Sequence, residues 1–494
     1  MTASDQELRR QVLEEVQKHK ANVENDPYRL QFHHMPPAGL MNDPNGWIQW
    51  KGTYHLFYQW MPFETDHGAK FWGHYTTEDF IHWTHEKIAL TPSEWYDKDG
   101  CFSGSAIIHE DKLYLFYTGN VFNESGEREA YQCMAVSEDG VTFVKKGVVA
   151  HLPEGYTAHF RDPKVWKKGE EWYMVVGAQT TEQEGKVVLF RSSRLTEWQF
   201  LGEIAGSGEN DLASFGYMWE CPDLFELQNT DVLITSPQGL QADGMDYANT
   251  YQSGYFLGTL DESVPHYRHG SFKELDRGFE FYAPQTTLDE KGRRILVGWM
   301  GVPDQFEQEH PTIEQQWIHC LTMPRQLSVR NQQIIQQPLE EYQAMRGPVL
   351  LYSSITIEND QKAVRGIGGR STELFIEMET LDDQFALELF QYASISYTKK
   401  DNVITVSRPH LKDKSQTEFR RVKLEGELRN LHLFIDSSSL EVFVNDGEEV
   451  FTSRIFADPA EKDILFTSIG QTTFSIEQWS LSGFIHHSRL EEEK

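Results

Sequence analysis

The run GTYHLFYQ at residues 52–59 is rich in aromatic and β-branched residues and follows a turn-forming stretch. Similar runs occur at 112–119 (KLYLFYTG), 171–178 (EWYMVVGA), 231–238 (DVLITSPQ) and 293–300 (RRILVGWM). Such runs, bounded by Gly, Asp and Asn, predict β-strands. Aligning their equivalent positions gives spacings of 59, 59, 60 and 62 residues between Phe57, Phe116, Val175, Thr235 and Val297. A fixed β period is typical of a propeller, and an irregular sandwich would not need one. We therefore predict a five-bladed β-propeller over residues 30–345.

Three carboxylates share one phase of this repeat. Asp43 lies 14 residues before its aligned position, Asp162 lies 13 before and Glu220 lies 15 before. We call this place in the repeat, 13 to 15 residues before the aligned position, the slot of each unit. The slot holds Phe102-Ser103-Gly104 in the second unit and Tyr282-Ala283-Pro284 in the fifth. Any single Asp-Pro is usually a turn, as LMNDPNGW at 40–47 would suggest. If each slot starts an innermost strand, however, the three acids converge on one axis. Like charges resist joint ionisation, so at least one pKa in the cluster should be raised, as suits glycoside hydrolysis.

Length and composition limit the number of domains and the classes of partner that this protein can have. At 494 residues the chain is long enough for two domains. Hydrophobic residues make up 39% and aromatic residues 13%, as expected for a folded protein. The net charge of −31 disfavours a nucleic-acid partner or an anionic membrane. No histidine set has metal-ligand geometry and no phosphate-binding glycine loop is present, so neither a metal nor another cofactor is expected.

The two ends of the chain differ from the repeat. Residues 1–29 should form an amphipathic helix rather than a signal peptide, because Leu8, Val12 and Val16 share a face and no apolar core is present. Four cysteines without CxxC spacing favour a reducing compartment, and we expect a cytoplasmic protein. Short alternating runs return after about residue 350 and predict a β-sandwich over 346–494. Its expected role is support, with carbohydrate binding or homodimer formation as alternatives.

The slot residues lie within motifs that resemble those of the β-fructofuranosidases, which include invertases, bacterial sucrose-6-phosphate hydrolases and fructan-cleaving relatives. The matching motifs are MNDPNG at 41–46, FYQW at 57–60, FWGH at 71–74, FSGSA at 102–106, FRDPKVW at 160–166, WECPDLF at 219–225 and VGWMG at 297–301. They occur in the family's order and cover the propeller, and DSSSLEVFVNDGEEVFTSR at 436–454 is similar to the family's sandwich signature. HGAKFWGHY and DKDGCFSGSA are most similar to the bacterial sucrose-6-phosphate hydrolase branch.

The resemblance implies a role for each acid. Asp43 matches the nucleophile, Glu220 the acid/base, and Asp162 the third acid that holds fructose hydroxyls. A nucleophile must stay ionised, and Asp has the lower intrinsic pKa of the two acid types. A retaining double displacement needs the two reacting carboxyl groups roughly 5 to 5.5 Å apart. The resemblance also implies substrate contacts by Asn42, Gln59, Phe102, Ser103, Arg161 and Trp299.

Several of these binding positions have a competing interpretation. Gln59 and Trp299 lie inside repeat strands and could simply pack there. In ETDHGAKFWGH at 64–74 the chain departs from the many family members that carry an additional Trp, which leaves Trp72 as the expected aromatic contact. Lys70 or a nearby His could meet a phosphate, although a lone surface Lys is usually just solvated.

We therefore expect a retaining hydrolase that releases fructose from β-fructofuranosides, with sucrose 6-phosphate and sucrose as the favoured substrates. A fructo-oligosaccharide or fructan hydrolase is the alternative within the class. An inverting five-bladed arabinanase or xylosidase also uses three acids, but MNDPNG and WECPDLF argue against it. A non-catalytic sugar-binding propeller would have no reason to keep all three acids.

Overall fold

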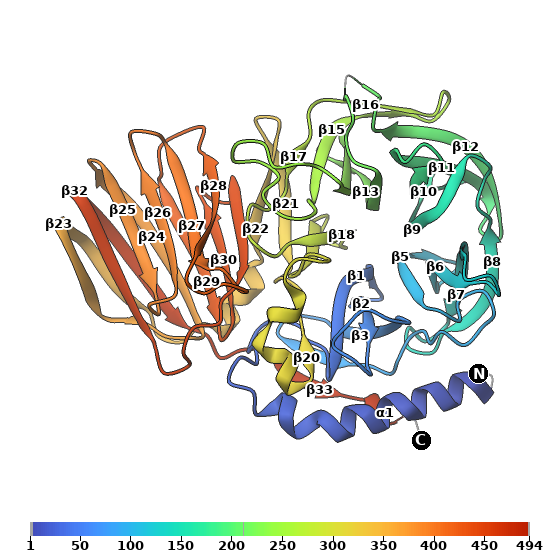
Figure 1. Ribbon diagram of the computed structural model, residues 1–494, viewed down its shortest axis with the longest axis horizontal. Coiled ribbons are helices and arrows are strands. Elements are labelled where there is room, and N and C mark those ends of the chain that lie inside the picture. Colours follow the sequence, from blue (N-terminus) through green and yellow to red (C-terminus); the bar gives the residue numbers. More distant parts are fainter. Residues whose placement is uncertain (1–2, 211, 493–494) are drawn as a thin grey trace.

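The computed structural model describes residues 3–210 and 212–492. Helix α1 (Ala3–Glu24) precedes a chain that is otherwise almost entirely strands (Figure 1). Short 3₁₀ turns occur at η1 (Glu307–Glu309), η2 (Pro311–Gln315), η3 (Glu340–Met345) and η4 (Leu490–Glu492). Among the described helices, none is long and apolar enough to cross a membrane.

The first part of the chain forms a β-propeller of separate antiparallel sheets, apart from two short parallel pairings in the first. The first sheet, in the order β20-β1-β2-β3-β4-β33, contains β1 (Gly39–Trp50), β2 (Thr53–Met61), β3 (Phe71–Thr77), β4 (His82–His85), β20 (Trp317–Ile318) and β33 (Ile485–Ser488). The second contains β5 (Cys101–His109), β6 (Lys112–Phe122), β7 (Arg128–Ser137) and β8 (Val144–Ala150). The third contains β9 (Tyr156–Lys168), β10 (Glu171–Thr180), β11 (Gly185–Arg194) and β12 (Glu197–Gly206).

Two further sheets complete this part of the chain. One contains β13 (Met218–Leu227), β14 (Thr230–Gln238), β15 (Gly254–Asp261), β16 (His266–His269) and β17 (Lys273–Glu274). The other contains β18 (Tyr282–Leu288), β19 (Arg294–Trp299), β21 (Arg325–Arg330) and β22 (Gln333–Pro338). The strands β1, β5, β9, β13 and β18 surround the middle of the propeller in Figure 1. The five aligned sequence positions all fall on the next strand of each sheet, so the strands predicted from the repeat are confirmed.

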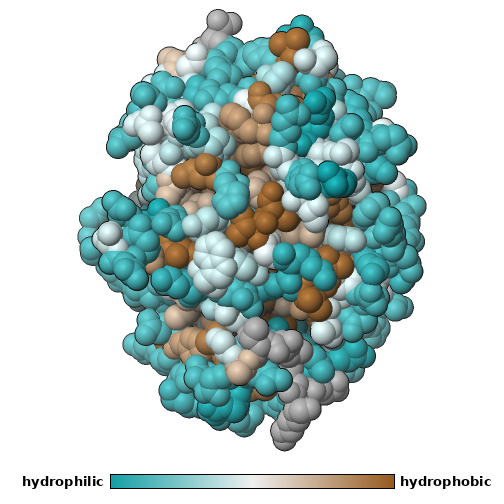
Figure 2. Space-filling model, turned by 90° about the vertical axis from the view of Figure 1, so that its right-hand side faces the viewer, coloured by the Kyte–Doolittle hydropathy of each residue, from teal (hydrophilic) through white to brown (hydrophobic). Residues whose placement is uncertain are grey.

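The inner and outer strands of the propeller differ in burial. Most of β1 is buried, whereas β8 and β12 are largely half-buried or exposed. Figure 2 looks at the edge of the propeller that lies to the right in Figure 1, where hydrophilic side chains are interspersed with apolar ones. Val144 on β8 is 56% exposed and Phe200 on β12 is 37% exposed. Polar groups on the outer strands therefore need only solvent, whereas polar groups near the axis need specific partners.

The second part of the chain is sandwich-like. It contains β23 (Leu350–Gly368), β24 (Thr372–Leu381), β25 (Gln384–Leu389), β26 (Ala393–Thr398), β27 (Val403–Pro409), β28 (Thr417–Lys423), β29 (Asn430–Asp436), β30 (Ser439–Val444), β31 (Glu449–Arg454) and β32 (Asp463–Ser480). A sandwich is usually built from two separate sheets, but here all ten strands form one sheet. The long strand β32 pairs first with β25 and then with β24, and β23 follows it along both parts. The two arms of the sheet thereby enclose one apolar core that includes Leu387 and Leu433.

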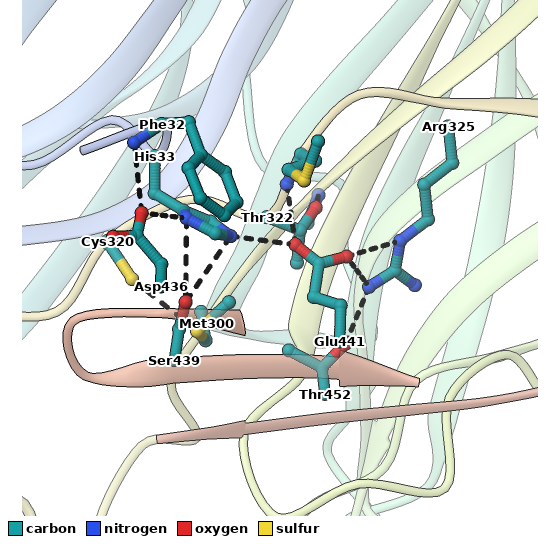
Figure 3. A network of polar contacts seen from close by, with 12 residues as sticks. Phe32, His33, Met300, Cys320, Thr322, Arg325, Asp436, Ser439, Glu441 and Thr452 are labelled. Atoms are coloured by element: carbon teal, nitrogen blue, oxygen red, sulfur yellow. Dashed lines mark hydrogen bonds and ion pairs between the residues drawn. The ribbon is translucent and has the colours of Figure 1, made fainter. Parts of the chain in front are cut away.

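A buried polar network joins the propeller to the sandwich (Figure 3). The imidazole of His33 lies between Asp436 and Glu441, at 2.9 Å from each carboxylate. The Arg325 guanidinium donates to Glu441 through Nε at 3.0 Å and Nη2 at 2.5 Å. Burial alone would lower the pKa of His33, but the hydrogen bonds and charges of the two carboxylates outweigh it and raise that pKa. The contact between the two parts of the chain is thus a network of matched charges.

The two ends of the chain also contact the propeller. The C-terminal strand β33 pairs in parallel with β4, after the chain has left the sandwich. On α1, Val12 is fully buried and belongs to the same apolar cluster as residues of the first sheet. The helix and the last strand therefore cover the same region of the propeller, at the bottom of Figure 1.

Candidate active site

Each innermost strand of the propeller is interrupted by a β-bulge at the same place. The pairing of β1 with β2 shifts between Met41 and Pro44, and equivalent shifts occur in the other four sheets. The residues inside the bulges are Asn42-Asp43, Phe102-Ser103, Asp162-Pro163, Cys221-Pro222 and Ala283-Pro284. Proline has no N–H for the strand ladder, so it suits a bulge. Bulges re-aim side chains, and these lie in the repeat slot found in the sequence.

The three acids line one cavity of about 530 Å³. They come from the first, third and fourth sheets, and the predicted convergence of the repeat slots is thereby observed. Of the residues expected to contact substrate, Asn42, Gln59, Phe102, Arg161 and Trp299 also line this cavity. Ser103 and Trp72 do not lie among the lining residues.

Asp43 is held by side chains of the first two sheets. The Ser103 hydroxyl donates to its Oδ2 at 2.5 Å, and the Asn42 amide donates to its Oδ1 at 3.2 Å. Asn42 also donates to Gln59 at 2.7 Å, and Gln59 donates to Ser103 at 2.7 Å. Burial raises the pKa of Asp43, and the hydrogen bond from Ser103 opposes that rise. Ser103 therefore holds Asp43 from behind the cavity wall, and Gln59, which lines the cavity, orients Ser103 in turn.

Glu220 accepts hydrogen bonds from three side chains. Arg161 donates to Oε1 through Nε at 2.9 Å and Nη2 at 2.5 Å. The Gln238 amide and the Tyr282 hydroxyl donate to Oε2 at 2.8 and 2.6 Å. Burial raises the pKa of Tyr282 well above its usual value, so the phenol keeps its proton and remains a donor. Both carboxyl oxygens of Glu220 are thus oriented.

Asp162 has far fewer partners. Among the described residues, its carboxylate accepts one hydrogen bond, from the backbone N–H of Cys221 at 2.9 Å. Its backbone has φ of 70°, a left-handed conformation that few non-glycine residues adopt, although Asp adopts it more readily than most, and it marks the bulge. Burial raises the pKa of Asp162 to about 7, although the Arg161 charge opposes that shift. The prediction that at least one pKa of the cluster is raised is confirmed by Asp43 and Asp162.

The two tryptophans expected to meet substrate lie in different places. Trp299 lines the cavity, and its buried indole N–H has no hydrogen-bond partner among the described residues. Trp72 is fully buried and donates through Nε1 to the backbone oxygen of Phe102 at 3.1 Å, so it supports the wall from behind. Direct substrate contact by Trp72 stays a prediction.

Several residues of the site were given no role from the sequence. Tyr282 occupies the repeat slot of the fifth unit, which was the signal that could have identified it. Gln238 is the last residue of the fourth repeat run and ends β14, but it lies in no motif that would single it out. For Lys70, by contrast, the sequence suggests either a phosphate contact or a solvated surface residue. It is buried, lines the cavity and contacts His67 at 3.0 Å, and burial lowers the pKa of Lys70 to about 7. Within residues 3–210 and 212–492, no group of three or more His, Cys, Asp or Glu side chains is arranged to hold a metal ion.

Comparisons with known proteins agree with this geometry. Residues 33–338 match the model of the glycosyl hydrolases family 32 N-terminal domain, and residues 341–480 match the family 32 C-terminal model. A sucrose-6-phosphate hydrolase of Bacillus subtilis (strain 168) is 53% identical over 97% of this chain and 100% of its own length.

Solved structures give the same result. A family 32 β-fructofuranosidase of Bombyx mori has a TM-score of 0.82 and 34% identity, over 97% of this chain and 99% of that one. A sucrose-6-phosphate hydrolase of Lactobacillus gasseri has a TM-score of 0.85 and 28% identity, over 95% of this chain and 96% of that one.

Proposed function

Since this chain belongs to glycosyl hydrolase family 32, we propose that it hydrolyses sucrose 6-phosphate and sucrose to release fructose. The observation that carries the proposal is the convergence of Asp43, Asp162 and Glu220, from three sheets, on one cavity. Its volume of about 530 Å³ is of the size that binds a small ligand such as a disaccharide.

We infer that Asp43 is the nucleophile and Glu220 the acid/base of a retaining double displacement. Asp43 attacks the anomeric carbon of the fructosyl unit, while Glu220 gives its proton to the glycosidic oxygen and the glucosyl unit leaves. Glu220 then takes a proton from water, which attacks the fructosyl ester and frees Asp43. The hydrogen bonds of Ser103 and Asn42 support the ionised nucleophile. The donors Arg161, Gln238 and Tyr282 aim Glu220 at the bond that breaks.

We propose that Asp162 holds the fructose hydroxyls. Asp162 has unused acceptor capacity, since among the described residues only the backbone N–H of Cys221 is seen to donate to its carboxylate. A sugar hydroxyl can donate to that carboxylate, which offsets the cost of burying it. Asn42 and Trp299 line the same cavity, and we propose that they contact the sugar as well.

We also infer the finer organisation of the molecule. The five small sheets are the blades of one propeller, and the chain divides into an N-terminal helix (1–29), the propeller (30–345) and the sandwich (346–494). The four-stranded ladders and the repeated bulge support five equivalent blades. The change of sheet between β22 and β23 supports the second boundary.

We propose that the enzyme acts in the cytoplasm, where sucrose phosphorylated during uptake would reach it. The four cysteines are all buried as free thiols, which suits a reducing compartment. For a homodimer we propose contact through β23, an edge strand on which Leu351 is 60% exposed. Sedimentation of the protein as a monomer at micromolar concentration would reject the dimer.

The proposed reaction is tested by kcat/KM for sucrose 6-phosphate, sucrose and inulin, measured as fructose release. We expect cleavage of the two sucrose substrates and slower cleavage of inulin, because a polymer must extend out of a small cavity. Fructose release from inulin at the higher rate would support the fructan alternative instead. A folded protein that releases fructose from none of the three would overturn the proposal.

A further inference from the structure

Four side chains that can carry positive charge line the cavity: His67, Lys70, Arg128 and Arg161. Three of them are engaged within the protein. Arg161 pairs with Glu220, Lys70 contacts His67 at 3.0 Å, and His67 contacts Glu307 at 3.1 Å. The side chain of Arg128 has neither a hydrogen bond nor an ion pair within residues 3–210 and 212–492. The cavity wall therefore carries one guanidinium whose five N–H donors are unused.

Aromatic rings hold Arg128 in place. It is the first residue of β7 and pairs in register with Phe122, the last residue of β6. Its guanidinium carbon lies 5.7 Å from the ring centre of Phe102 and 5.4 Å from that of Phe122. Stacking on rings leaves the edge of a guanidinium free to donate. Arg128 is thus ordered by its surroundings but is not neutralised by them, which is an arrangement suited to an anionic ligand.

Arg128 lines the same cavity as Glu220 and lies on the second sheet, next to the ring of the bulge residue Phe102. In the proposed reaction Glu220 protonates the glycosidic oxygen, so the glucosyl unit lies beyond Glu220. The charges of Arg161 and Glu220 also act on Arg128. These observations support a place for Arg128 on the wall that meets the glucosyl unit and any group attached to it.

A phosphorylated substrate needs an unpaired cation in this cavity, because the other charges of the cavity wall are mainly negative. The cavity contains three acids, and Asp99 and Asp304 also line it, in a chain of net charge −31. Asp99 is partly engaged, because it accepts a hydrogen bond from the backbone N–H of Phe122 at 2.7 Å. A phosphate monoester carries roughly −1.5 to −2 charges at pH 7 and would be repelled by these carboxylates. Lys70 is a poor counterion, since burial lowers its pKa to about 7.

We propose that Arg128 binds the phosphate of the glucosyl unit through a bidentate contact and thereby sets the preference for sucrose 6-phosphate over sucrose. The proposal rests on the proposed function and names the specificity residue of the same cavity. Arg–phosphate pairs form two parallel hydrogen bonds, which a neutral sugar hydroxyl cannot match.

The test compares Arg128→Gln with the wild type and with Arg268→Gln. Arg268 is exposed on β16, the outer strand of its sheet, so its loss removes the same charge far from the cavity. The measured quantity is the ratio of kcat/KM for sucrose 6-phosphate to kcat/KM for sucrose. Arg128→Gln should lower this ratio by about tenfold or more, chiefly through KM, because a charged hydrogen-bond pair is lost. Arg268→Gln should leave the ratio within about twofold of the wild type.

Two further measurements sharpen the result. Arg128→Lys keeps a positive charge but loses the planar guanidinium that can donate two parallel hydrogen bonds. Its ratio of kcat/KM for the two substrates should therefore lie between those of the wild type and Arg128→Gln. Inhibition by glucose 6-phosphate should weaken by about tenfold in Arg128→Gln, because the product carries the same phosphate.

The outcomes separate this proposal from the proposed function. A wild type that cleaves both substrates, with an unchanged ratio in Arg128→Gln, would overturn the phosphate role alone. Equal loss on both substrates would also overturn it, since Arg128 would then position the glucosyl ring or the fold. A wild type that cleaves neither substrate would overturn the proposed function itself.

Discussion

Two buried carboxylates of this molecule differ in how many hydrogen-bond donors surround them. Asp162 lies at the cavity, and Glu441 lies at the contact between propeller and sandwich. Glu441 is fully buried and accepts hydrogen bonds from His33, from the backbone N–H of Met323 and twice from Arg325. Asp162 is 5% exposed, and within the part of the chain that the structure describes its carboxylate accepts a single hydrogen bond. Both carboxylates have lost nearly all contact with water, so the difference between them comes from their hydrogen-bond donors and neighbouring charges and not from burial.

The difference appears in the two pKa values. Burial raises the pKa of Glu441, but the charge of Arg325 and the hydrogen bond of His33 outweigh it and lower that pKa to about 2. At Asp162 burial prevails over the charge of Arg161, and the pKa rises to about 7. A carboxylate that is fully satisfied stabilises the fold, whereas one that is left short of donors keeps capacity for a ligand. Among the three acids of the site, Asp162 is therefore the one that is recognisable by its missing partners, since Asp43 and Glu220 are both held by side-chain donors.

The largest effect should come from Asp43→Asn. An amide is not a nucleophile, so kcat should fall by a factor on the order of 10⁴ or more, without loss of folded protein. The same neutral substitution at the interface, Glu441→Gln, should instead act on stability. Fructose release and thermal unfolding of both variants check this contrast. Substantial activity in Asp43→Asn would remove Asp43 from the role of nucleophile.

Glu220→Ala should slow cleavage by roughly 10² to 10⁴-fold, which is the usual contribution of a general acid. A substrate with a good leaving group needs less help from the acid, and azide can replace the water that Glu220 activates. Both should partly restore turnover in the variant. Gln238→Ala serves as the control, since it removes one donor to Glu220 but leaves the acid in place. If Glu220→Ala were as active as the wild type, Glu220 would have no part in the chemistry.

Glu441→Gln should lower the free energy of unfolding by about 3–5 kcal/mol, because it removes one of the two carboxylates that pair with each of the buried cations, Arg325 and His33. The pKa of Glu441 is depressed, so its stabilisation is complete above its unfolded pKa of about 4.5 and is lost as the pH falls toward about 2. The difference between variant and wild type should therefore shrink below pH 4. Urea unfolding at several pH values measures it.

Glu358→Gln, an exposed change on the edge strand β23, is the matched control and should alter the unfolding free energy by less than about 0.5 kcal/mol. An equally small change in Glu441→Gln would mean that the interface network does not stabilise the fold.

Asp162→Asn should stabilise the protein while it impairs catalysis. The folded pKa of Asp162 is raised, so its ionisation destabilises the fold progressively from its unfolded pKa of 3.8 up to about 7. The gain in the variant should be near zero at pH 4 and reach at most about 4 kcal/mol at pH 8. The exposed change Asp401→Asn should show no such trend. A variant less stable than the wild type at pH 8 would contradict the contrast between the two carboxylates.

Much of the fold and of the site could be predicted from the spacing of 59 to 62 residues between similar strand runs in the sequence. The alignment of Phe57 with its four counterparts predicted the second strand of every sheet, and the slot residues met at one cavity. What the period did not predict is the bulge, because the pairing register depends on the partner strand. It also did not predict that Trp72 lies behind Phe102 rather than at the cavity, since a strand motif does not reveal which side a ring faces.

The remaining features depend on contacts between residues far apart in sequence. His33 meets Asp436 and Glu441 across about 400 residues, and β33 returns to pair with β4. No local pattern marks either pairing. Likewise, the lack of a partner for Arg128 can be known only once all neighbouring carboxylates have been placed.

The most direct test of the account is to trap the covalent intermediate. Glu220→Ala is incubated with a β-fructofuranosyl substrate that has a good leaving group, and the protein is digested and examined by mass spectrometry. The slow second step should let a fructosyl ester accumulate on the peptide that carries Asp43. A fructosyl label on another residue would contradict the assignment of Asp43 as the nucleophile. So would release of fructose with inverted configuration at its anomeric carbon and no covalent intermediate.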